Sequence, residues 1–386
     1  MPTFSNLPIA VPDPIFAVAA KARAAGPEAI DGTVGVYLSE EGKPALFPSV
    51  QRALQDVGAT LAVRSYSYPP LTGLPAYRAA VTRLLFGEDA PLVAGIASTG
   101  GTGAVALNLR LALLFDSAIT LILPTPAWAN YPRLIGGAQM RRVDVPYLDG
   151  GRPTIEGITQ ALRQAKGSCV VLLQAGCHNP VGLDFDQGQW EELTQAMKER
   201  QAITLLDLAY QGFAGTPEED AKPVRLFARQ GVTTLVAWSA SKNHALYGER
   251  TGFACAVVPD EAFRKQVEGH YALLTRSIHS AAATFGQTVV TRVQEAYSDA
   301  WRQDLAAVRS MLHRKRQALS AALPERMRGA VSGQGMFALL PLSPAEIDRL
   351  QTEQKVFLTD DGRINVAGIP LARMEELGEK IRKVAG

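Results

Sequence analysis

The sequence has few cysteines, and their positions argue against two kinds of structure. Its 386 residues include three cysteines, Cys169, Cys177 and Cys255. An odd number without CxxC spacing gives neither a disulfide framework nor a zinc site. We therefore expect a protein whose thiols stay reduced and which binds no metal.

The sequence also lacks an excess of one charge and a long apolar run. The formal net charge is only +2, so no basic surplus is available to neutralise the backbone of a nucleic acid. The most apolar stretch, Leu111 to Leu123, is interrupted by Asp116 and is too short to cross a bilayer. Residues 1–16 have no basic segment and no long apolar core, so we expect no secretory signal. These features favour a cytoplasmic protein with neither a nucleic acid nor a membrane as partner.

The length and composition favour a folded protein with two domains. A chain of 386 residues is long for a single core, and 47% hydrophobic with 20% charged residues is ordinary for a globular protein. No repeat or low-complexity run separates two parts, so we expect the domains to be interleaved. We predict a large domain over residues 45–309. Both chain ends, 1–44 and 310–386, should form a smaller α+β domain that opens with a basic helix at Ser310.

Short apolar runs alternate with amphipathic segments in the middle of the chain. The runs lack the polar/apolar alternation of half-exposed strands, so we predict strands buried on both faces. Amphipathic segments such as Gln189–Arg200 and Lys222–Arg229 should be helices between them. The expected fold is α/β, with a mainly parallel central sheet flanked by helices. The predicted strands are Ala118–Leu123, Cys169–Leu173, Ile203–Leu206 and Thr233–Trp238.

Polar residues follow each of these predicted strands. Trp128 comes after the first strand, Asn179 after the second, Asp207 at the end of the third, and Ser239 with Lys242 after the fourth. Ligands of parallel sheets bind beyond the carboxyl ends of the strands, so these residues should meet at one pocket. The tryptophan can stack there on a cofactor ring, or it can simply pack.

A lysine directly after a buried strand is unusual, because burying an ammonium group is costly unless it is paired or neutral. Lys242 avoids this cost if it forms a Schiff base, and a lowered pKa suits proton transfer. Ser239 and Arg250 are suited to hold a phosphate dianion, the arginine through a two-pronged fork. Most lysines are solvated surface charges, so the position alone does not establish catalysis.

Other residues have a structural and a functional interpretation side by side. Gly101 and Thr102 lie in a glycine-rich stretch at a predicted helix start. Such a stretch can bind an anion, or it can simply begin a core helix. Asp207 can face a pyridinium nitrogen, or it can satisfy backbone donors in the core. Tyr210 and Asn179 can hydrogen-bond a phenolic oxygen of a cofactor.

Seven motifs follow one another along the chain: YPPLTGLPAYR, STGGTGA, PAWANY, CHNPVG, DLAYQGFA, SASKNHALYGER and GRINVAG. In this order they resemble the fold-type I, class I aminotransferases that depend on pyridoxal 5′-phosphate (PLP), in the aspartate/aromatic amino acid branch (subgroup I-alpha). The resemblance runs from Gly35 to Gly368, nearly the whole chain. DLAYQGFA together with SKN…LYGER is the most specific part.

The resemblance implies a homodimer with shared active sites and a role for each matching residue. Lys242 resembles the Schiff-base lysine, Asp207 the partner of the pyridine nitrogen, and Tyr210 a catalytic tyrosine that also binds the cofactor. The other implied cofactor-binding residues are Gly101, Thr102, Trp128, Asn179, Ser239, Ser241 and Arg250, with Tyr68 lent by the neighbouring subunit. The implied substrate-binding residues are Gly35, Trp128, Asn179, Arg363 as the α-carboxylate clamp, and the neighbour's copy of Arg276 for a second carboxylate.

Several positions depart from the family's pattern. Val181 stands where threonine is common, and Tyr131 stands where a histidine usually supports the aspartate. After Arg276, residues 279–283 read HSAAA in place of a stretch similar to YSNPP. Leu38 is apolar where aspartate-restricted members often carry a charge, which favours tolerance of aromatic side chains.

The resemblance implies transamination between an L-amino acid and 2-oxoglutarate with ping-pong kinetics. The donor would be aromatic, such as tyrosine or phenylalanine, or aspartate, or both. Alternatives are a strictly aspartate-specific aminotransferase, another PLP reaction (a β-lyase or decarboxylase), and a non-catalytic PLP-fold effector module. Two carboxylate clamps, Arg363 and Arg276, favour exchange between amino and oxo acids. Lys242 and the lack of a helix-turn-helix segment disfavour the effector module.

Overall fold

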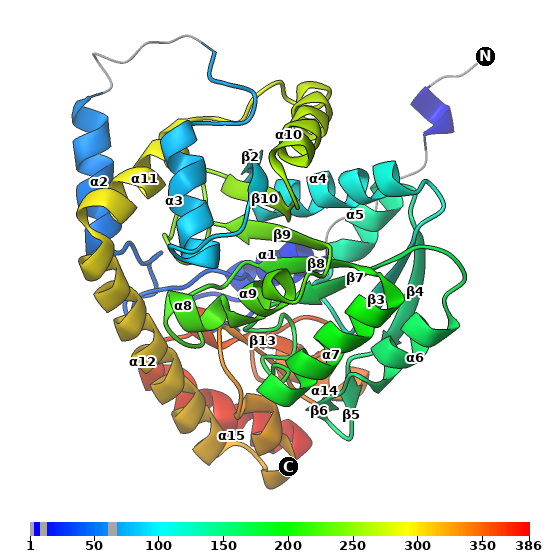
Figure 1. The fold of residues 1–386 in the computed structure, drawn as a ribbon. Helices are drawn as coiled ribbons and strands as arrows, with labels where there is room; N and C mark the ends of the chain where they lie inside the picture. The colour runs from blue at the N-terminus through cyan, green and yellow to red at the C-terminus, as the bar shows by residue number, and fades with distance from the viewer. Residues whose placement is uncertain (1–3, 8–13, 61–67) are drawn as a thin grey trace.

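The computed structural model describes residues 4–7, 14–60 and 68–386, which build a central sheet covered by helices (Figure 1). The sheet has seven strands in the order β2-β10-β9-β8-β7-β3-β4. Only β10 runs against its neighbours, and the other pairs are parallel. The predicted α/β class with a mainly parallel sheet is confirmed. The strands are β2 Val93–Thr99, β3 Thr120–Thr125, β4 Arg141–Pro146, β7 Cys169–Gln174, β8 Ile203–Leu208, β9 Thr234–Ser239 and β10 Thr251–Val257.

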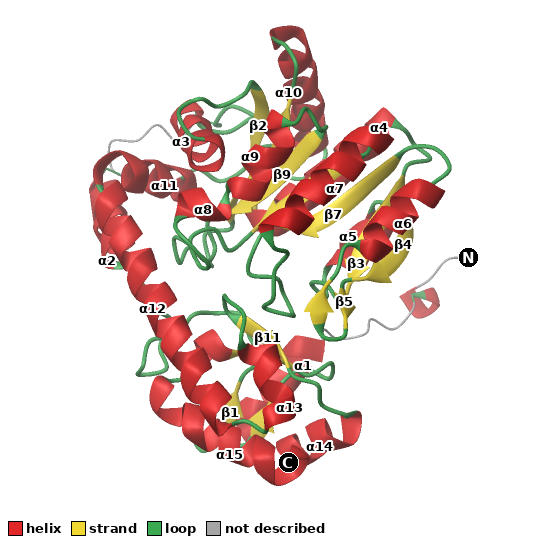
Figure 2. Ribbon diagram, turned by 60° about the horizontal axis from the view of Figure 1, so that its bottom comes forward, coloured by secondary structure: helices red, strands yellow, loops and turns green. Residues whose placement is uncertain are grey.

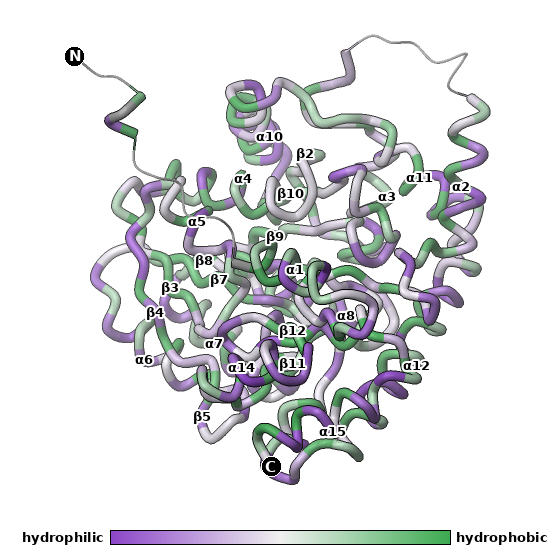
Figure 3. The backbone as a smooth tube through the Cα atoms, turned by 180° about the vertical axis from the view of Figure 1, so that it is seen from behind, coloured by the Kyte–Doolittle hydropathy of each residue, from purple (hydrophilic) through white to green (hydrophobic). Residues whose placement is uncertain are grey.

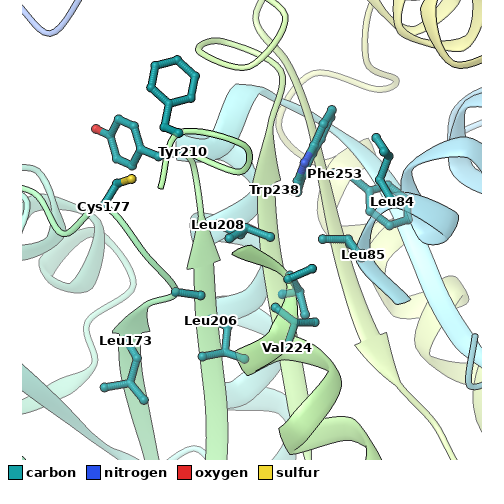
Figure 4. Packing of buried hydrophobic residues seen from close by; sticks show 14 of the residues in the cluster. Leu84, Leu85, Leu173, Cys177, Leu206, Leu208, Tyr210, Val224, Trp238 and Phe253 are labelled. Atoms are coloured by element: carbon teal, nitrogen blue, oxygen red, sulfur yellow. The ribbon is translucent and has the colours of Figure 1, made fainter. Parts of the chain in front are cut away.

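Neighbouring residues of the inner strands enter two different hydrophobic cores. On β8, Leu206 and Leu208 join one core, together with Trp238 of β9, whereas Leu205 joins the other. Figure 4 shows Leu206 and Leu208 among the packed side chains of the first core, with Val224 beside them. Both faces of the sheet are therefore buried, as the unbroken apolar runs predict.

Helices cover each face of the sheet (Figure 2). Residues of α4, α5 and α10 contribute to one core, and residues of α3, α6, α7, α9 and α11 contribute to the other. The predicted helix over Lys222–Arg229 is α9, and the one over Gln189–Arg200 begins slightly earlier, at Gln187. The bounds are α3 Pro75–Phe86, α4 Gly100–Phe115, α5 Tyr131–Gly137, α6 Glu156–Gln164, α7 Gln187–Arg200, α9 Lys222–Arg229, α10 Glu261–Arg276 and α11 Phe285–Ala296.

A third core lies away from the sheet and is built from both chain ends. Ile30 packs there with residues from Leu319 to Ala385. Strand β1 pairs with β12, and β11 pairs with β13. The domain boundaries at 44/45 and 309/310 stay a prediction, and residues 1–3 and 8–13 lie outside the described ones. The elements are α1 Pro14–Ala24, β1 Ile30–Asp31, β11 Phe337–Leu339, α14 Pro344–Thr352, β12 Val356–Phe357, β13 Arg363–Asn365 and α15 Met374–Ala385.

One helix, α12 (Ser298–Ala322), runs from the sheet to this third core. The basic helix predicted from about Ser310 is the second half of α12, which begins twelve residues earlier. Trp301, Leu305 and Val308 are buried at intervals of three to four residues, so the same apolar stripe continues back along the helix. Hydrophobic and hydrophilic residues alternate along α12 (Figure 3).

The remaining elements are short or lie at the periphery. All three cysteines are buried free thiols. None of the helices formed by the described residues has the length and apolarity needed to cross a bilayer. The remaining short or peripheral elements are α2 Pro48–Ala59, β5 Leu148–Asp149, β6 Arg152–Pro153, α8 Pro217–Asp220, α13 Glu325–Arg328, and the 3-10 helices η1 Phe4–Asn6, η3 Gly329–Val331, η4 Val366–Gly368 and η5 Leu371–Arg373.

Candidate active site

A cavity of about 180 Å³ lies where the carboxyl ends of β8 and β9 meet the start of α4. Gln174, Ala209 and Tyr247 line it without having been predicted. Tyr247 belongs to the LYGER motif, which could have signalled it. Gln174 is a polar residue that ends an apolar run. The predicted site residues that line the cavity are Gly101, Thr102, Trp128, Asn179, Asp207, Tyr210, Ser239, Ser241, Lys242 and Arg250.

Lys242 reaches into the cavity from the turn after β9. Its surface is partly accessible, and that surface lines the cavity. Nζ lies 5.1 Å from the centroid of the Tyr210 ring. Burial lowers the pKa of Lys242 to about 8, although the nearby Asp207 carboxylate opposes this shift and Arg250 adds to it. A sizeable fraction of this amine is therefore neutral near pH 7 to 8.

Asp207 lies inside β8, one residue before the strand ends. The hydroxyl of Tyr131 donates to its Oδ2 over 2.7 Å. Burial raises the pKa of Asp207 to about 6, while the hydrogen bond from Tyr131 and the charge of Lys242 act in the opposite direction. Its Oδ1 is buried and has no hydrogen-bond partner among the described residues. The departure from histidine at position 131 left open which residue hydrogen-bonds Asp207. In the structure, Tyr131 makes this hydrogen bond.

Asn179 and Tyr210 form a hydrogen-bonded pair beside the lysine. The amide nitrogen Nδ2 of Asn179 donates to the Tyr210 hydroxyl over 3.3 Å. The side chain of Gln174 holds the backbone of Asn179 at both ends, with distances of 2.8 and 2.9 Å. Burial raises the pKa of Tyr210 above its ordinary value, against the effects of Asn179 and Arg363.

The opposite end of the cavity is suited to an anion. Helix α4 begins directly after β2, and Gly101 and Thr102 of its first turn line the cavity, so the positive end of the helix dipole lies there. Ser241 Oγ lies 3.0 Å from Ser239 Oγ and accepts from Arg250 Nη1 over 3.2 Å. A Cβ atom added to Gly101 would lie 3.1 Å from Cβ of Ser239, so a larger residue would narrow this end.

A second cavity, of about 220 Å³, adjoins the first, and Asn179 lines both. Arg363 of β13 lines it and is buried. Its Nη2 donates to the Thr33 carbonyl over 2.6 Å, and Nη1 approaches Asn179 Oδ1 at 3.5 Å. The guanidinium carbon lies 4.8 Å from the centre of the Phe337 ring. The structure thus brings Arg363 next to the cavity that Lys242 and Asp207 line.

Gly35, predicted to bind substrate, and Val181 line neither cavity. A Cβ atom on Gly35 would come within 2.9 Å of Phe337 Cζ, so glycine allows a close approach to that ring. Phe337 in turn meets the Tyr210 ring edge-on, with 6.1 Å between centroids. Val181 packs in the core on one face of the sheet.

Tyr68 and Arg276 do not line either cavity of the chain that carries them. Tyr68 is 93% exposed. Arg276 is exposed at the end of α10, where its Nη1 donates to Ser280 Oγ over 2.8 Å. The altered loop after it is closed by the amides of Ile278, His279 and Ser280, which all approach the carbonyl of Thr275 at 3.0 to 3.1 Å.

These residues fit PLP. The cup of α4, Ser239, Ser241 and Arg250 matches its phosphate. The unpaired Oδ1 of Asp207 provides an acceptor for a protonated ring nitrogen. The Asn179–Tyr210 pair suits the phenolic oxygen, and Lys242 suits the aldehyde. The roles themselves stay predictions.

Comparisons with known proteins agree with this chemistry. The family model for aminotransferase class I and II matches residues 28–381. The aromatic-amino-acid aminotransferase of Paracoccus denitrificans is 32% identical over 377 residues, covering 94% of this chain and 95% of that protein. Aspartate aminotransferase 1 of Medicago sativa is 31% identical over 400 residues, covering 99% and 95%. The structure of the Burkholderia pseudomallei aromatic-amino-acid aminotransferase, covalently bound to pyridoxal phosphate, superposes with a TM-score of 0.94, 30% identity and full coverage of both chains.

Proposed function

Because the chain belongs to the aminotransferase class I and II family, we propose that it exchanges an amino group between an L-amino acid and 2-oxoglutarate. It is a PLP-dependent aminotransferase. The donor is an aromatic amino acid such as tyrosine or phenylalanine, or aspartate, or both. The relatives include enzymes named for each of these specificities. The two half-reactions follow ping-pong kinetics.

The observation that carries this proposal is that Lys242, Asp207, Asn179 and Arg363 line two adjoining cavities. When bound, PLP supplies an aldehyde for the amino group and a ring that takes up electrons from the substrate Cα. Lys242, with a pKa of about 8, can act as a neutral amine that takes a proton from the substrate Cα and then gives it to C4′ of the cofactor. This use of one lysine as base and then acid requires the low pKa that burial gives it.

Asp207 keeps the ring nitrogen protonated, which favours the uptake of electrons by the ring. Its Oδ1 faces no other donor among the described residues, so it can accept that N–H. Bringing a positive charge to Asp207 also returns its pKa towards the ordinary range, because an opposite charge stabilises the carboxylate. Tyr210 and Asn179 hold the phenolic oxygen, and Trp128 covers the ring face.

Arg363 binds the α-carboxylate of each substrate through its two-pronged guanidinium group. The contact of Arg363 with Asn179, the residue assigned to the phenolic oxygen, supports this role. The rest of the second cavity is lined by apolar side chains of Ile15, Ala127, Ala129 and Pro180 and by the polar residues Thr359, Asp360 and Asp361. The apolar part supports tolerance of aromatic substrates over strict aspartate specificity.

The active form is a homodimer in which each subunit lends Tyr68 and Arg276 to its neighbour's site. Both residues lie outside their own chain's cavities and are exposed. Leu273 and Ile278, close to Arg276 in sequence, are 70% and 51% exposed, which suits a surface covered by a second copy. Tyr68 would complete the phosphate cup, and Arg276 would bind the second carboxylate of a dicarboxylic substrate.

We place the enzyme in the cytoplasm, since its three cysteines are unpaired thiols in the core. Its partners are then small amino and oxo acids, with no nucleic acid or membrane.

A panel of amino donors with 2-oxoglutarate tests the function directly. Tyrosine, phenylalanine and aspartate should each yield the corresponding oxo acid, measured by chromatography. A cysteine conjugate that releases a thiol, or an amino acid that releases CO₂ instead of an oxo acid, would favour a β-lyase or a decarboxylase. Formation of oxo acid from aspartate alone would establish the strictly aspartate-specific alternative.

A further inference from the structure

A small cavity lies next to the pair formed by Tyr131 and Asp207. Its volume is about 10 Å³, close to that needed for a single water molecule. Tyr131, Gln174 and His178 line it together with apolar side chains from β3 and β7. A buried water needs two to four polar partners, and these three residues can provide them.

His178 has a buried ring nitrogen without a protein partner. Nδ1 makes no hydrogen bond to any described residue. The ring is held in place because it stacks on Tyr147, with 3.8 Å between centroids and 13° between planes. Its backbone N–H donates to Asp184 Oδ1 over 2.9 Å. Burial lowers the pKa of His178 to about 3, so the ring is neutral. Since an unsatisfied buried nitrogen is costly, a water is a suitable partner.

The Tyr131 hydroxyl has capacity left on the same cavity. Its one hydrogen is donated to Asp207, and a hydroxyl oxygen can still accept hydrogen bonds. The ring of Tyr131 is 1% exposed and is fixed edge-on against Trp128, with 5.3 Å between centroids. Gln174 is fixed as well, because both ends of its amide bind the backbone of Asn179.

We propose that one ordered water fills this cavity and bridges the Tyr131 hydroxyl to Nδ1 of His178, which makes His178 a positioning residue for Asp207. The water donates to the Tyr131 oxygen, and this strengthens the hydrogen bond that Tyr131 donates to Asp207. The proposal rests on the proposed role of Asp207 at the cofactor's ring nitrogen. A better stabilised carboxylate keeps more positive charge on that nitrogen.

Three groups face Asp207 and act on it besides the water. They are Tyr131 from α5, Lys242 from the turn after β9, and Tyr210 from the segment after β8. Arg250 acts on Lys242 in turn. A useful variant must leave all of these in place. His178→Phe does so, since it keeps an aromatic ring to stack on Tyr147 and removes both ring nitrogens, at the cost of a slightly larger ring.

The first test is a high-resolution crystal structure of the wild-type holoenzyme. It should show one ordered water within hydrogen-bond distance of both Tyr131 Oη and His178 Nδ1. An empty cavity, or a water that contacts neither atom, overturns the proposal. This measurement requires no variant to fold.

The second test is a pH titration of the visible absorption of the bound cofactor. A variant that weakens Asp207 reduces the positive charge on the cofactor's ring nitrogen. The Lys242 nitrogen bound to the cofactor then keeps its proton to higher pH, so the midpoint of this titration should rise. We expect a rise of about one pH unit for Tyr131→Phe and a few tenths of a unit for His178→Phe. The double variant should match Tyr131→Phe alone, because His178 acts through Tyr131.

Tyr271→Phe is the matched control. Tyr271 is also fully buried, and its hydroxyl donates to Asn108 and not to Asp207, so its loss should leave the midpoint unchanged. An unchanged midpoint for His178→Phe, or a shift that adds to that of Tyr131→Phe, overturns the positioning role. If Tyr131→Phe itself causes no shift while the water is present, the assignment of Asp207 to the ring nitrogen is what has failed, and the positioning role falls with it.

Discussion

Burial shifts the pKa values of Lys242 and Asp207 in opposite directions. The pKa of the lysine falls to about 8 and that of the carboxyl rises to about 6. Each charge partly offsets the shift of the other. Two groups whose pKa values bracket neutral pH and share one cavity are typical of a site that moves protons.

The low pKa of Lys242 predicts how PLP joins the apoenzyme. The neutral amine is the nucleophile, so the rate constant for association should rise with pH and level off above a midpoint near pH 8. A lysine with an ordinary pKa would give a midpoint near pH 10.4. Stopped-flow absorbance over a pH series measures this rate. A midpoint above pH 9.5 would mean that the cavity does not lower the pKa.

Replacement of Lys242 tests its identity as the reactive lysine. Lys242→Ala should still bind PLP through the phosphate cup but should lose the covalent link and transaminase activity. Borohydride reduction followed by peptide mass spectrometry locates the link in the wild type. Lys198→Ala, at an exposed position of α7, is the control and should keep it. A reducible link that persists in Lys242→Ala would point to another lysine.

Arg363 and Arg276 should have separable effects on substrates. Arg363→Ala should reduce kcat/KM for every substrate, because all of them carry an α-carboxylate. Arg276→Ala should reduce kcat/KM for aspartate by about 2–5 kcal/mol, the loss expected when a desolvated charge pair is broken. Tyrosine should be spared when its half-reaction is measured alone by single-turnover absorbance. Equal losses for aspartate and tyrosine would contradict the role of Arg276.

The sequence predicted which residues line the cavity better than it predicted how they are supported. Lys242 and Asp207 could be placed because strand ends of a parallel sheet meet at one edge. The resemblance placed Tyr131 at the position that supports the aspartate, but the hydrogen bond itself could not be predicted, since it depends on the position of α5 relative to β8, which lie far apart in sequence. The pairing of Gln174 with Asn179 likewise depends on the path of a loop.

Among the elements, β10 and α4 control the shape of the anion-binding end. Gly100 has a φ of +64°, and its N–H donates to the Arg250 carbonyl over 2.7 Å. Gly252 of β10 lies so close that an added Cβ would be 2.4 Å from the Gly100 carbonyl. Because Gly252 has no side chain, α4 can begin close to β10, at a place where the amides of its first turn reach the cavity.

Gly252→Ala should displace the start of α4. We expect a loss of stability of about 1–3 kcal/mol from overpacking together with weaker PLP binding, measured by urea unfolding and by cofactor titration. Gly269→Ala on α10 is the matched control. A Cβ there meets nothing within 4 Å, so it should be neutral or stabilise the helix by up to about 1 kcal/mol. If both variants bind PLP equally well, the close approach of β10 does not matter for the cup.

The elements that sequence patterns missed have a common physical reason. The edge strand β4 has mostly exposed residues, including Arg141 and Arg142, so it lacks the apolar run of a buried strand. Strand β10, with the sequence TGFACAV, has mostly small side chains. Its antiparallel direction depends on its pairing with β2 and β9. The start of α12 at Ser298 depends on tertiary burial of Trp301 and Leu305.

At the scale of the whole molecule, the proposed dimer can be tested by mixing subunits. Lys242→Ala dimers should be inactive, and Arg276→Ala dimers nearly inactive towards aspartate. When equal amounts are refolded together, about half of the dimers are hybrids. Each hybrid has one site that joins an intact Lys242 to an intact Arg276. About a quarter of wild-type aspartate activity should therefore return.

The mixing experiment needs proof that hybrids form. Two affinity tags, one on each variant, allow the hybrid to be purified and its activity compared with both parents. A purified hybrid as inactive as its parents would mean that both residues serve the same chain's site, and the shared-site proposal would fail.

Helix α12 gives the protein a mechanical property. Its 25 residues form one continuous rod, about 37 Å long, between the sheet that carries Asn179 and the core beside Arg363. Because the helix is continuous, it is a stiff connection between the two parts of the molecule that carry the guanidinium and the amide, which lie 3.5 Å apart. A proline introduced in the middle of α12 would kink this connection. The geometry of the α-carboxylate clamp therefore depends on the straightness of a helix that does not touch the substrate.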